Sequence, residues 1–429
     1  MQLVAYGAQD IYLTGQPQIT FFKSVYRRHT NFAVESIQQT INGSVSAGAR
    51  VSVTISRNGD LLKNLWVQYN PALLTPGAPT TTGGLAADLS HALFQILELE
   101  IGGQLIDRQY GLWLTIWRDL SEVNPTGAQG ELGVDGAEPV LNADSSNPST
   151  KYNYMAYTHQ VGANVDSTAA GPTEAYVPMR FWFCRNPGLA IPLIALQYHE
   201  VKFNIQFALQ SQWFSGSFAS TYGIGNANFA VYADYVYLDT TERRQFAQNA
   251  HEYLIDQLQQ QQESNSGTNA SATYRLNFNH PVKELIWVGT PTAPTVASSS
   301  VDSLVGGATP GAITTLSGAL SQMQTKIILN GTDRFTARNL KYFTRNQIWD
   351  CHTGFGATGV QDSIAVYSFA LRPEEHQPSG TCNFSRIDTA QLWFNSSNSS
   401  EYVSAITIFA VNYNVLRIMS GMGGLAYSN

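Results

Sequence analysis

Three stretches of the sequence carry residue types that could do chemistry. Cys351 and His352 are adjacent and could act as a nucleophile and its base. The stretch HEVKF, which starts at His199, begins with the same two residues, His and Glu, as the zinc-binding motif of a zinc protease. GFGATG at 354–359 has the glycine spacing of a dinucleotide-binding loop. Each of these activities requires a particular local structure around the residues.

The surrounding residues do not predict any of these activities. Neighbouring residues of a strand point to opposite faces, so the side chains of Cys351 and His352 are not expected to meet. HEVKF lacks the second histidine of the zinc motif, and GFGATG is followed by the alternating stretch 360–371 rather than by a helix that could bind phosphate. We therefore expect no catalytic residue, no cofactor-binding residue, no metal site and no enzymatic activity.

The composition favours an assembly protein. Charged residues make up 13% of the 429 residues, about half of the ~25% usual for soluble domains, so the polar surface must consist mostly of amides and hydroxyls. The net charge of -7 argues against direct nucleic-acid binding, which needs a basic face. No apolar run is long enough for a transmembrane helix, the N-terminus does not read as a secretion signal, and the three cysteines have neither disulfide nor zinc spacing.

The elements that carry these residues are predicted to be strands. Apolar and polar residues alternate, as at 50–56 and 200–207, whereas long helical periodicity is scarce. Four blocks of the first half recur in the same order in the second half, which predicts an internal duplication. The paired blocks are 61–69 with 281–289, 97–108 with 325–334, 176–188 with 366–380, and 228–238 with 406–416. The first pair leads us to expect Trp66 and Trp287 at equivalent, buried strand positions.

The duplication predicts an all-β protein of two consecutive eight-stranded jelly-roll β-sandwiches. We place an N-terminal arm at 1–21, the first jelly roll at 22–239, a linker at 240–251 and the second jelly roll at 252–429. Loops rich in Thr, Pro, Gly and Ala fall at matching places in the two halves. We expect them at one end of each sandwich, because alternate connections of an antiparallel sandwich emerge at the same end. The glycine-rich tail at 419–429 is either a flexible end or docks on a neighbouring subunit.

Six segments carry a family resemblance: QLVAYGAQDIYLTGQPQITFFKSVYRRHTNF, SRNGDL, PLIALQYHEVKF, HEYLIDQLQ, QPSGTCNFSRID and NYNVLRIMSGMGGLAYSN. They resemble the major capsid proteins of nucleocytoplasmic large DNA viruses, most of all the chlorella-virus (phycodnavirus) type, and the resemblance covers nearly the whole chain. It implies a structural protein of three chains per pseudo-hexagonal capsomer, with capsomers tiling an icosahedral shell over an internal membrane. The partners implied are the other chains of a homotrimer, neighbouring capsomers and minor capsid proteins. The location implied is the outer capsid of the virion, after synthesis in the host cytoplasm.

The N-terminal stretch 16–32 combines aromatic and basic residues and has three interpretations. The simplest is that Phe21, Phe22 and Tyr26 belong to an entering strand, while the basic residues are solvated or paired. The family resemblance adds a second interpretation, in which its basic residues contact partners at the base of the capsomer; the candidates are Lys23, Arg27 and Arg28. Direct contact with the membrane or with nucleic acid is the third and least favoured, because one small basic cluster rarely anchors a protein.

Two further expectations concern sugars. Asn269, Asn395 and Asn398 are sequon asparagines in Ser-rich segments and are the candidate glycosylation sites, although relatives of the chlorella-virus type use a route that does not follow this sequon. The alternative function is a lectin-like, carbohydrate-binding β-sandwich, because jelly rolls and lectins share an architecture and Trp213 and Tyr222 could stack on sugars.

Overall fold

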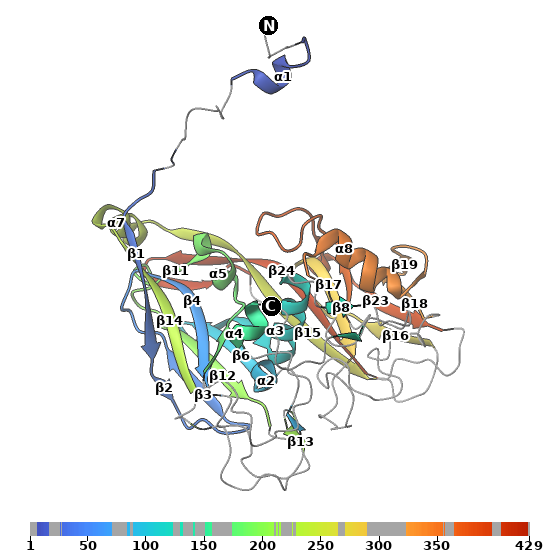
Figure 1. Cartoon of the computed structure of the whole chain (residues 1–429), viewed down its shortest axis with the longest axis horizontal. Helices are drawn as coiled ribbons and strands as arrows, with labels where there is room; N and C mark the ends of the chain where they lie inside the picture. The colour runs from blue at the N-terminus through green and yellow to red at the C-terminus, as the bar shows by residue number, and fades with distance from the viewer. Residues whose placement is uncertain are drawn as a thin grey trace.

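The structure of the chain is a computed structural model. It describes residues 7–16, 26, 28–70, 84–85, 89–122, 129–131, 140–141, 151–156, 174–209, 212, 214–215, 225, 229–264, 271–289, 323–354, 356, 364–396 and 405–427. Figure 1 shows two β-sandwiches side by side along the longest axis, with the N-terminal helix α1 (Ile11–Thr14) standing away from both. The loops that we expected at one end of each sandwich lie mostly outside the described residues.

The first sandwich consists of two antiparallel sheets. One sheet has the order β1-β14-β4-β10, with β11 beside β4; the bounds are β1 (Phe32–Gln39), β14 (Phe229–Leu238), β4 (Leu61–Tyr69), β10 (Ala175–Pro178) and β11 (Ile191–Pro192). The facing sheet has the order β2-β3-β12-β6-β7; the bounds are β2 (Ile41–Asn42), β3 (Arg50–Thr54), β12 (Val201–Phe207), β6 (Phe94–Ile101) and β7 (Gln104–Tyr110). Side chains alternate between buried and partly exposed along β14, as expected for a strand with one face on the core.

The second sandwich has the same construction. One sheet has the order β15-β24-β17-β21, with β22 beside β17 and β25 beside β24; the bounds are β15 (His251–Ser264), β24 (Ala405–Met419), β17 (Pro281–Gly289), β21 (Ile364–Ser368), β22 (Cys382–Asn383) and β25 (Met422–Leu425). The facing sheet has the order β16-β23-β18-β19, with β20 beside β18; the bounds are β16 (Ser271–Arg275), β23 (Ala390–Asn395), β18 (Gln324–Leu329), β19 (Thr332–Asp333) and β20 (Arg338–Asn339).

The two sandwiches have one topology. If the eight principal strands of each are numbered along the chain, the described sheets of both read 1-8-3-6 and 2-7-4-5. The hairpin between strands 4 and 5 has two central residues of positive φ in both cases, Gly102 and Gly103 in the first sandwich and Asn330 and Gly331 in the second. This is the backbone geometry of the two-residue turn that matches the twist of paired strands. The predicted duplication and the double jelly-roll fold are confirmed.

The equivalence of the strands extends to their register. In β4 a bulge falls at Lys63 between the pairs Leu62–Tyr235 and Asn64–Asp234, and in β17 a bulge falls at Lys283 between the pairs Val282–Asn412 and Glu284–Val411. Counting from the bulge, Trp66 corresponds to Ile286 and not to Trp287.

The expectation that the two tryptophans occupy equivalent buried positions is therefore wrong. Trp287 points into the core and is fully buried, whereas Trp66 lies on the outer face of its sheet and is half-buried. Neighbouring strand positions alternate between faces, so a shift of one residue reverses the side on which the ring lies.

Helices and small strand pairs occupy the connections. In the part of the chain that the structure describes, the α-helices besides α1 are α2 (Leu89–Ala92), α3 (Gly111–Ser121), α4 (Lys151–Ala156), α5 (Trp182–Arg185), α7 (Thr240–Gln248) and α8 (Gln347–Cys351). The same residues include the 3-10 turns η2 (Pro187–Leu189) and η7 (Phe384–Arg386) and the π-helical turn η6 (Tyr342–Asn346). They also include two short strand pairs, β5 (Gly84–Leu85) with β13 (Phe214–Ser215) and β8 (Gln129–Glu131) with β9 (Val140–Leu141). Among the described residues no helix has the length and apolar character to cross a bilayer.

The segments before and between the sandwiches differ from expectation in detail. The first strand begins at Phe32, and Tyr26 lies outside any strand with 86% of its surface exposed, so the interpretation of Tyr26 as part of an entering strand is wrong. Phe21 and Phe22 lie outside the described residues. The stretch predicted as a linker forms helix α7, and Asp239 is its N-cap, with its side chain accepting from the Thr240 N–H.

The core position of Trp287 predicts a large difference between two tryptophans of the second sandwich. Trp287→Ala should lower the free energy of unfolding by about 3–5 kcal/mol, because the side chain is fully buried in the core. Trp393→Ala should cost about 1 kcal/mol, since Trp393 is half-buried on an outer face, where its ring contacts Lys326. Urea unfolding monitored by circular dichroism measures both. Equal losses would contradict the assignment of Trp287 to the core.

Candidate assembly interface

Helix α3 of the first sandwich packs across the outer face of a sheet of the second sandwich. Trp113 lies with its ring centroid 5.4 Å from that of Phe409 on β24, and Trp117 lies beside Trp113. A separate apolar cluster forms there; its buried members are Trp113, Ile116, Trp117, Leu120, Leu258, Ile286, Val288, Ile348, Ile364, Val366, Phe409 and Val411. Figure 1 shows α3 between the two sandwiches. The outer face of sheet β15-β24-β17-β21 is therefore an internal contact surface.

The long strands β15 and β24 strengthen this contact. Their ends extend beyond the second sandwich, and Ile255, Leu416 and Ile418 join the core of the first. The N–H of Leu258 donates to the Asp107 carboxylate at 3.1 Å, and the Gln257 amide donates to the carbonyl of Ile106. The two sandwiches are thus connected by shared core residues and by hydrogen bonds to β7.

The glycine stretch 354–359 takes part in the same contact. The Gly354 N–H donates to the Leu120 carbonyl at 2.7 Å, and the Gly356 N–H donates to the Asp119 carbonyl at 2.8 Å, both at the end of α3. A Cβ atom on Gly354 would lie 2.2 Å from the Asp119 carbonyl oxygen, and Gly356 has a φ of +74°. Glycine is required here because two backbones approach closely, not because a phosphate binds. Phe355 and residues 357–359 lie outside the described residues.

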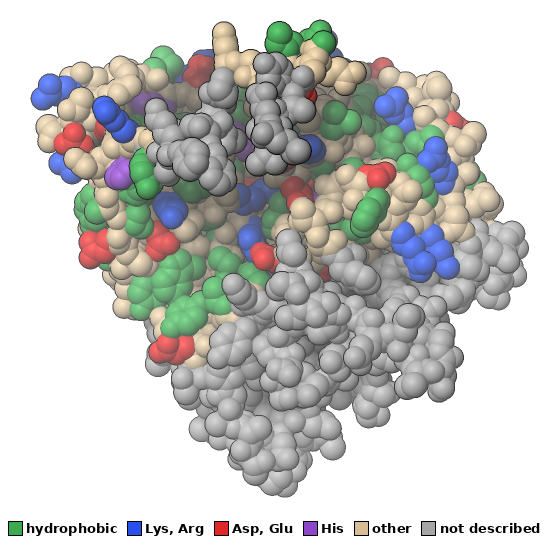
Figure 2. Space-filling view, turned by 45° about the horizontal axis from the view of Figure 1, so that its top comes forward, with side chains coloured by type: hydrophobic (Ala, Val, Ile, Leu, Met, Phe, Trp, Pro, Cys, Tyr) green, Lys and Arg blue, Asp and Glu red, His purple; other side chains and the backbone are tan. Residues whose placement is uncertain are grey.

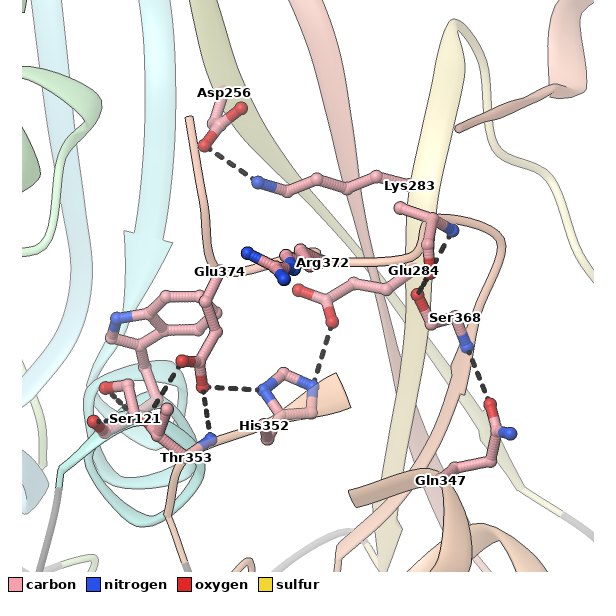
Figure 3. Close-up of polar contacts among 12 residues, drawn as sticks. Ser121, Asp256, Lys283, Glu284, Gln347, His352, Thr353, Ser368, Arg372 and Glu374 are labelled. Carbon is pink, nitrogen blue, oxygen red and sulfur yellow. Dashed lines mark hydrogen bonds and ion pairs between the residues drawn. The ribbon is translucent and has the colours of Figure 1, made fainter. Parts of the chain in front are cut away.

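His352 lies buried between two carboxylates at this contact. Its Nε2 atom is 3.1 Å from Oε2 of Glu284, and its Nδ1 atom is 3.0 Å from Oε1 of Glu374 (Figure 3). Burial opposes the charged imidazolium, but the two carboxylates outweigh burial and raise the pKa of His352 to about 9. The imidazolium therefore bridges the two carboxylates at neutral pH.

Thr353 extends this cluster to the first sandwich. Its N–H donates to Glu374 at 3.1 Å, and its hydroxyl lies within hydrogen-bonding distance of Glu374 and, at 3.0 Å, of the Ser121 carbonyl. Cys351 precedes His352 in the chain. It is the last residue of helix α8, not a strand residue as expected, and burial raises the pKa of its thiol.

A second charged cluster lies beside the first. Lys283 is fully buried and donates to Asp256 at 2.9 Å, and its ammonium lies 5.3 Å from the centroid of the Tyr413 ring. Arg185 approaches Asp256 at 3.6 Å from the first sandwich and lies over the ring of Trp117. A buried charge is tolerated only when it is paired, and these pairs connect the two sandwiches.

Asp107 is a further buried carboxylate at the contact. Burial raises the pKa of Asp107 to about 6, and the hydrogen bonds that it accepts from Leu258 and Gln109 oppose the shift only in part. Each of these ionisable groups has a partner across or beside the contact. The arrangement is that of a structural interface, and among the described residues no group of three or more His, Cys, Asp or Glu side chains is arranged so that it could hold a metal ion.

The C-terminal tail docks on the first sandwich of its own chain. The Tyr198 N–H donates to the Gly421 carbonyl at 3.0 Å, and the Gly423 N–H lies 3.1 Å from Nδ1 of His199. A Cβ atom on Gly423 would lie 2.7 Å from the Leu196 side chain. The tail is thus not a free end as far as Tyr427, and His199 of the HEVKF stretch takes part in this docking.

The residues proposed as contact and glycan sites are placed only in part. Arg28 is exposed and precedes the first strand, whereas Lys23 and Arg27 lie outside the described residues. Asn395 ends β23 and is half-buried. The described part of the chain does not include Asn269, Asn398, Trp213 or Tyr222. On the face drawn in Figure 2, basic and acidic side chains are interspersed among uncharged ones.

Sequence reasoning missed the buried charges. The signal for Lys283 and Glu284 was present, because two charged residues interrupt an otherwise apolar strand in PVKELIWVG. Such residues in a strand that is buried on both faces require partners. The partners of Lys283 and Glu284 lie far away in the sequence, so they cannot be identified from the sequence alone.

The glycine contact predicts a specific sensitivity. Gly354→Ala should weaken the packing of the two sandwiches by about 2–4 kcal/mol, because the new methyl group collides with backbone atoms that cannot move away without breaking two hydrogen bonds. Gly225→Ala is the matched control, since a Cβ atom there would meet no atom within 4 Å. Limited proteolysis and the thermal midpoint measure the effect. Identical behaviour of the two variants would refute the close approach.

The His352 cluster predicts a pH dependence. The folded-state pKa of about 9 exceeds the ordinary value of 6.5, so the stabilisation is fully present below pH 6.5 and is lost as the pH rises through 9. The free energy of unfolding should fall across this window, with a slope of at most about 1.4 kcal/mol per pH unit from this group. His352→Gln should flatten the slope, and His29→Gln, at an exposed site, should not. Urea unfolding at several pH values measures the slope, and an unchanged slope in His352→Gln would contradict the bridge.

Comparison with known proteins agrees with this architecture. The family described as "Major capsid protein N-terminus" matches residues 20–239, and the family described as "Large eukaryotic DNA virus major capsid protein" matches residues 242–424. The major capsid protein of Pyramimonas orientalis virus is 44% identical, and that of Paramecium bursaria Chlorella virus 1 is 43% identical. Each alignment spans 100% of this chain and 99% of the relative.

Solved structures give the same answer for the fold. A chain of the quasi-atomic model of the PBCV-1 virus capsid superposes with a TM-score of 0.73 and 37% identity, over 96% of this chain and 100% of that chain. The Faustovirus major capsid protein shares the fold with a TM-score of 0.62 at 14% identity, over 96% of this chain and 94% of that chain. The chain therefore belongs to the family of major capsid proteins of large eukaryotic DNA viruses.

Proposed function

We propose that three copies of this capsid protein form a pseudo-hexagonal capsomer, and that capsomers tile an icosahedral shell over an internal membrane. The observation that carries the proposal is the repeated strand order of two sandwiches in one chain. Three chains then supply six similar lobes, and a threefold ring of six lobes has the outline of a hexagon, which packs without gaps. Closed cyclic rings are a common form of homo-oligomer.

The low charge and the internal contact support this assembly. A surface with few charged residues favours close packing between subunits, because fewer charges need to be desolvated. Within one chain, a helix of one sandwich already packs on the outer sheet of the next. A ring of six sandwiches requires contacts of this kind at every junction.

The N-terminal arm is proposed to reach partners beneath the capsomer. Helix α1 stands away from the sandwiches in Figure 1, and Ile11 and Tyr12 expose 71% and 88% of their surfaces. Exposed apolar side chains on a projecting segment favour contact with another molecule. Neighbouring capsomers and minor capsid proteins are the proposed partners of the arm, through Lys23, Arg27 and Arg28, with the internal membrane nearby and without direct nucleic-acid contact.

The remaining parts of the proposal follow from a shell role. The chain performs no reaction, is made in the host cytoplasm and resides in the outer capsid, with Asn269, Asn395 and Asn398 as candidate glycan acceptors. Its domains are proposed as an arm at 1–21, sandwiches at 22–239 and 252–429, and a linker at 240–251.

The assembly predicts a stable trimer. Purified chain at micromolar concentration should have three times the monomer mass by light scattering, because obligate interfaces bury about 2,000 Å² or more. Negative-stain electron microscopy of the same sample should show hexagonal outlines. A chain that remains monomeric, or that binds a specific saccharide on a glycan array instead of assembling, would refute the capsomer.

A further inference from the structure

The outer sheet faces of the two sandwiches are equivalent in structure but differ in exposure. Counting from the shared bulge, Trp66 and Tyr232 of the first sandwich occupy the places of Ile286 and Phe409 in the second. By the same register, Pro178 corresponds to Val366 and Tyr176 to Ile364. In the second sandwich all four side chains are completely buried at the contact with α3. In the first sandwich all four are only half-buried.

The outer sheet face of the first sandwich is aromatic and hollowed. The ring of Trp66 stacks on that of Tyr232 with centroids 4.3 Å apart, and Tyr176 meets Trp66 edge-on at 5.4 Å. A hollow of about 340 Å³ lies beside them, with Met155 and Pro178 among its lining residues. We call this surface, defined by Trp66, Met155, Tyr176, Pro178 and Tyr232, the aromatic face. A space of this size accommodates a large side chain.

The second sandwich carries a counterpart of α3. Helix α3 follows the hairpin β6–β7, and the segment η6–α8 follows the equivalent hairpin β18–β19. Both contain the pair Ile-Trp, Ile116-Trp117 in α3 and Ile348-Trp349 in α8, and both isoleucines are buried.

The two tryptophans differ in their surroundings. Trp117 is 3% exposed within the internal contact, whereas Trp349 is 85% exposed. An exposed tryptophan on a helix whose counterpart is an interface anchor indicates a contact that the single chain does not complete.

We propose that Trp349 of one copy inserts into the aromatic face of a second copy of this chain. The intermolecular contact repeats the internal one: a helix that follows hairpin 4–5 of one sandwich packs on the outer sheet 1-8-3-6 of the next. The inference rests on the proposed trimer and deepens it, because it names the surfaces that meet at each subunit boundary.

The arrangement requires a second copy and not a fold-back of the same chain. The aromatic face and α8 belong to different sandwiches, which lie in the left and right halves of Figure 1. A contact between two different surfaces is heterologous, and repetition of it closes a ring when the rotation allows. The internal contact provides one junction of each chain, and the Trp349 contact provides the other.

Two charged residues support the proposed contact between Trp349 and the aromatic face. Arg345 is exposed four residues before Trp349, and Asp234 lies on the receiving sheet beside Trp66, whose indole N–H donates to it at 3.1 Å. In the internal contact, Val411 occupies the position of Asp234. Trp113, four residues before Trp117, occupies the position of Arg345. The internal junction therefore has two apolar residues where the proposed junction between chains has two residues of opposite charge, and this difference distinguishes the two junctions.

Site-specific cross-linking tests the geometry. Trp349→Cys and Tyr176→Cys in the same chain should give covalent dimers and trimers under mild oxidation on a non-reducing gel. The three native cysteines, Cys184, Cys351 and Cys382, are replaced by serine in all variants, because Cys184 lines the same hollow. In this background either single variant should give no cross-link, because the Trp349 surface meets the aromatic face and neither surface meets itself. Cross-linking of Trp349→Cys with itself would indicate a face-to-face contact and would overturn the proposal, as would the absence of cross-links in the double variant of a trimeric protein.

Truncation tests the contribution of the anchor. Trp349→Ala should raise the concentration at which the trimer dissociates by at least about tenfold, because central aromatic anchors dominate interfaces. Tyr198→Ala is the matched control, since it removes a 76% exposed aromatic ring from another surface. Circular dichroism should be unchanged in both. A trimeric wild type with equal dissociation of the two variants would overturn this inference and leave the trimer intact, whereas a monomeric wild type would overturn the proposed function itself.

Discussion

The structure depends on the burial of one helix between two sandwiches. Helix α3 belongs to the first sandwich, but its tryptophans Trp113 and Trp117 are covered by the outer sheet of the second. Replacing a buried tryptophan typically costs about 3–5 kcal/mol, which is comparable to the net stability of a whole domain. Neither sandwich could expose these surfaces to water without a large loss. The two sandwiches are therefore held together by a shared buried contact and not only by the connecting segment.

The buried charges determine how the two sandwiches align. A buried ion pair adds little net stability, because desolvation offsets most of the attraction. Separating its partners while they stay buried costs about 3–5 kcal/mol, so any sliding of one sandwich on the other is penalised. His352 between Glu284 and Glu374, and Lys283 on Asp256, thus fix the register that the apolar surfaces alone would leave free.

The duplicated fold allows two versions of one contact. The outer sheet of the second sandwich is apolar and covered within the chain, whereas that of the first keeps aromatic rings at its surface beside Asp234. In the proposed ring, one junction lies within the chain and one forms between chains. The difference between Val411 and Asp234 at equivalent positions is consistent with these two junctions.

The sequence by itself determined the fold and the duplication. Alternating strands, two-residue turns such as Asn330–Gly331 and the repeated blocks are local signals, because side-chain direction and turn geometry depend on nearby residues. The long family segments then identified the capsid family. Only the tertiary structure decided that Trp287 is core while Trp66 faces outward, because the two rings lie one residue apart relative to the bulge that both strands share, and neighbouring strand positions face opposite sides. It likewise decided that Gly354 contacts α3 and that His352 lies between Glu284 and Glu374, because these contacts join residues that are not neighbours in the sequence.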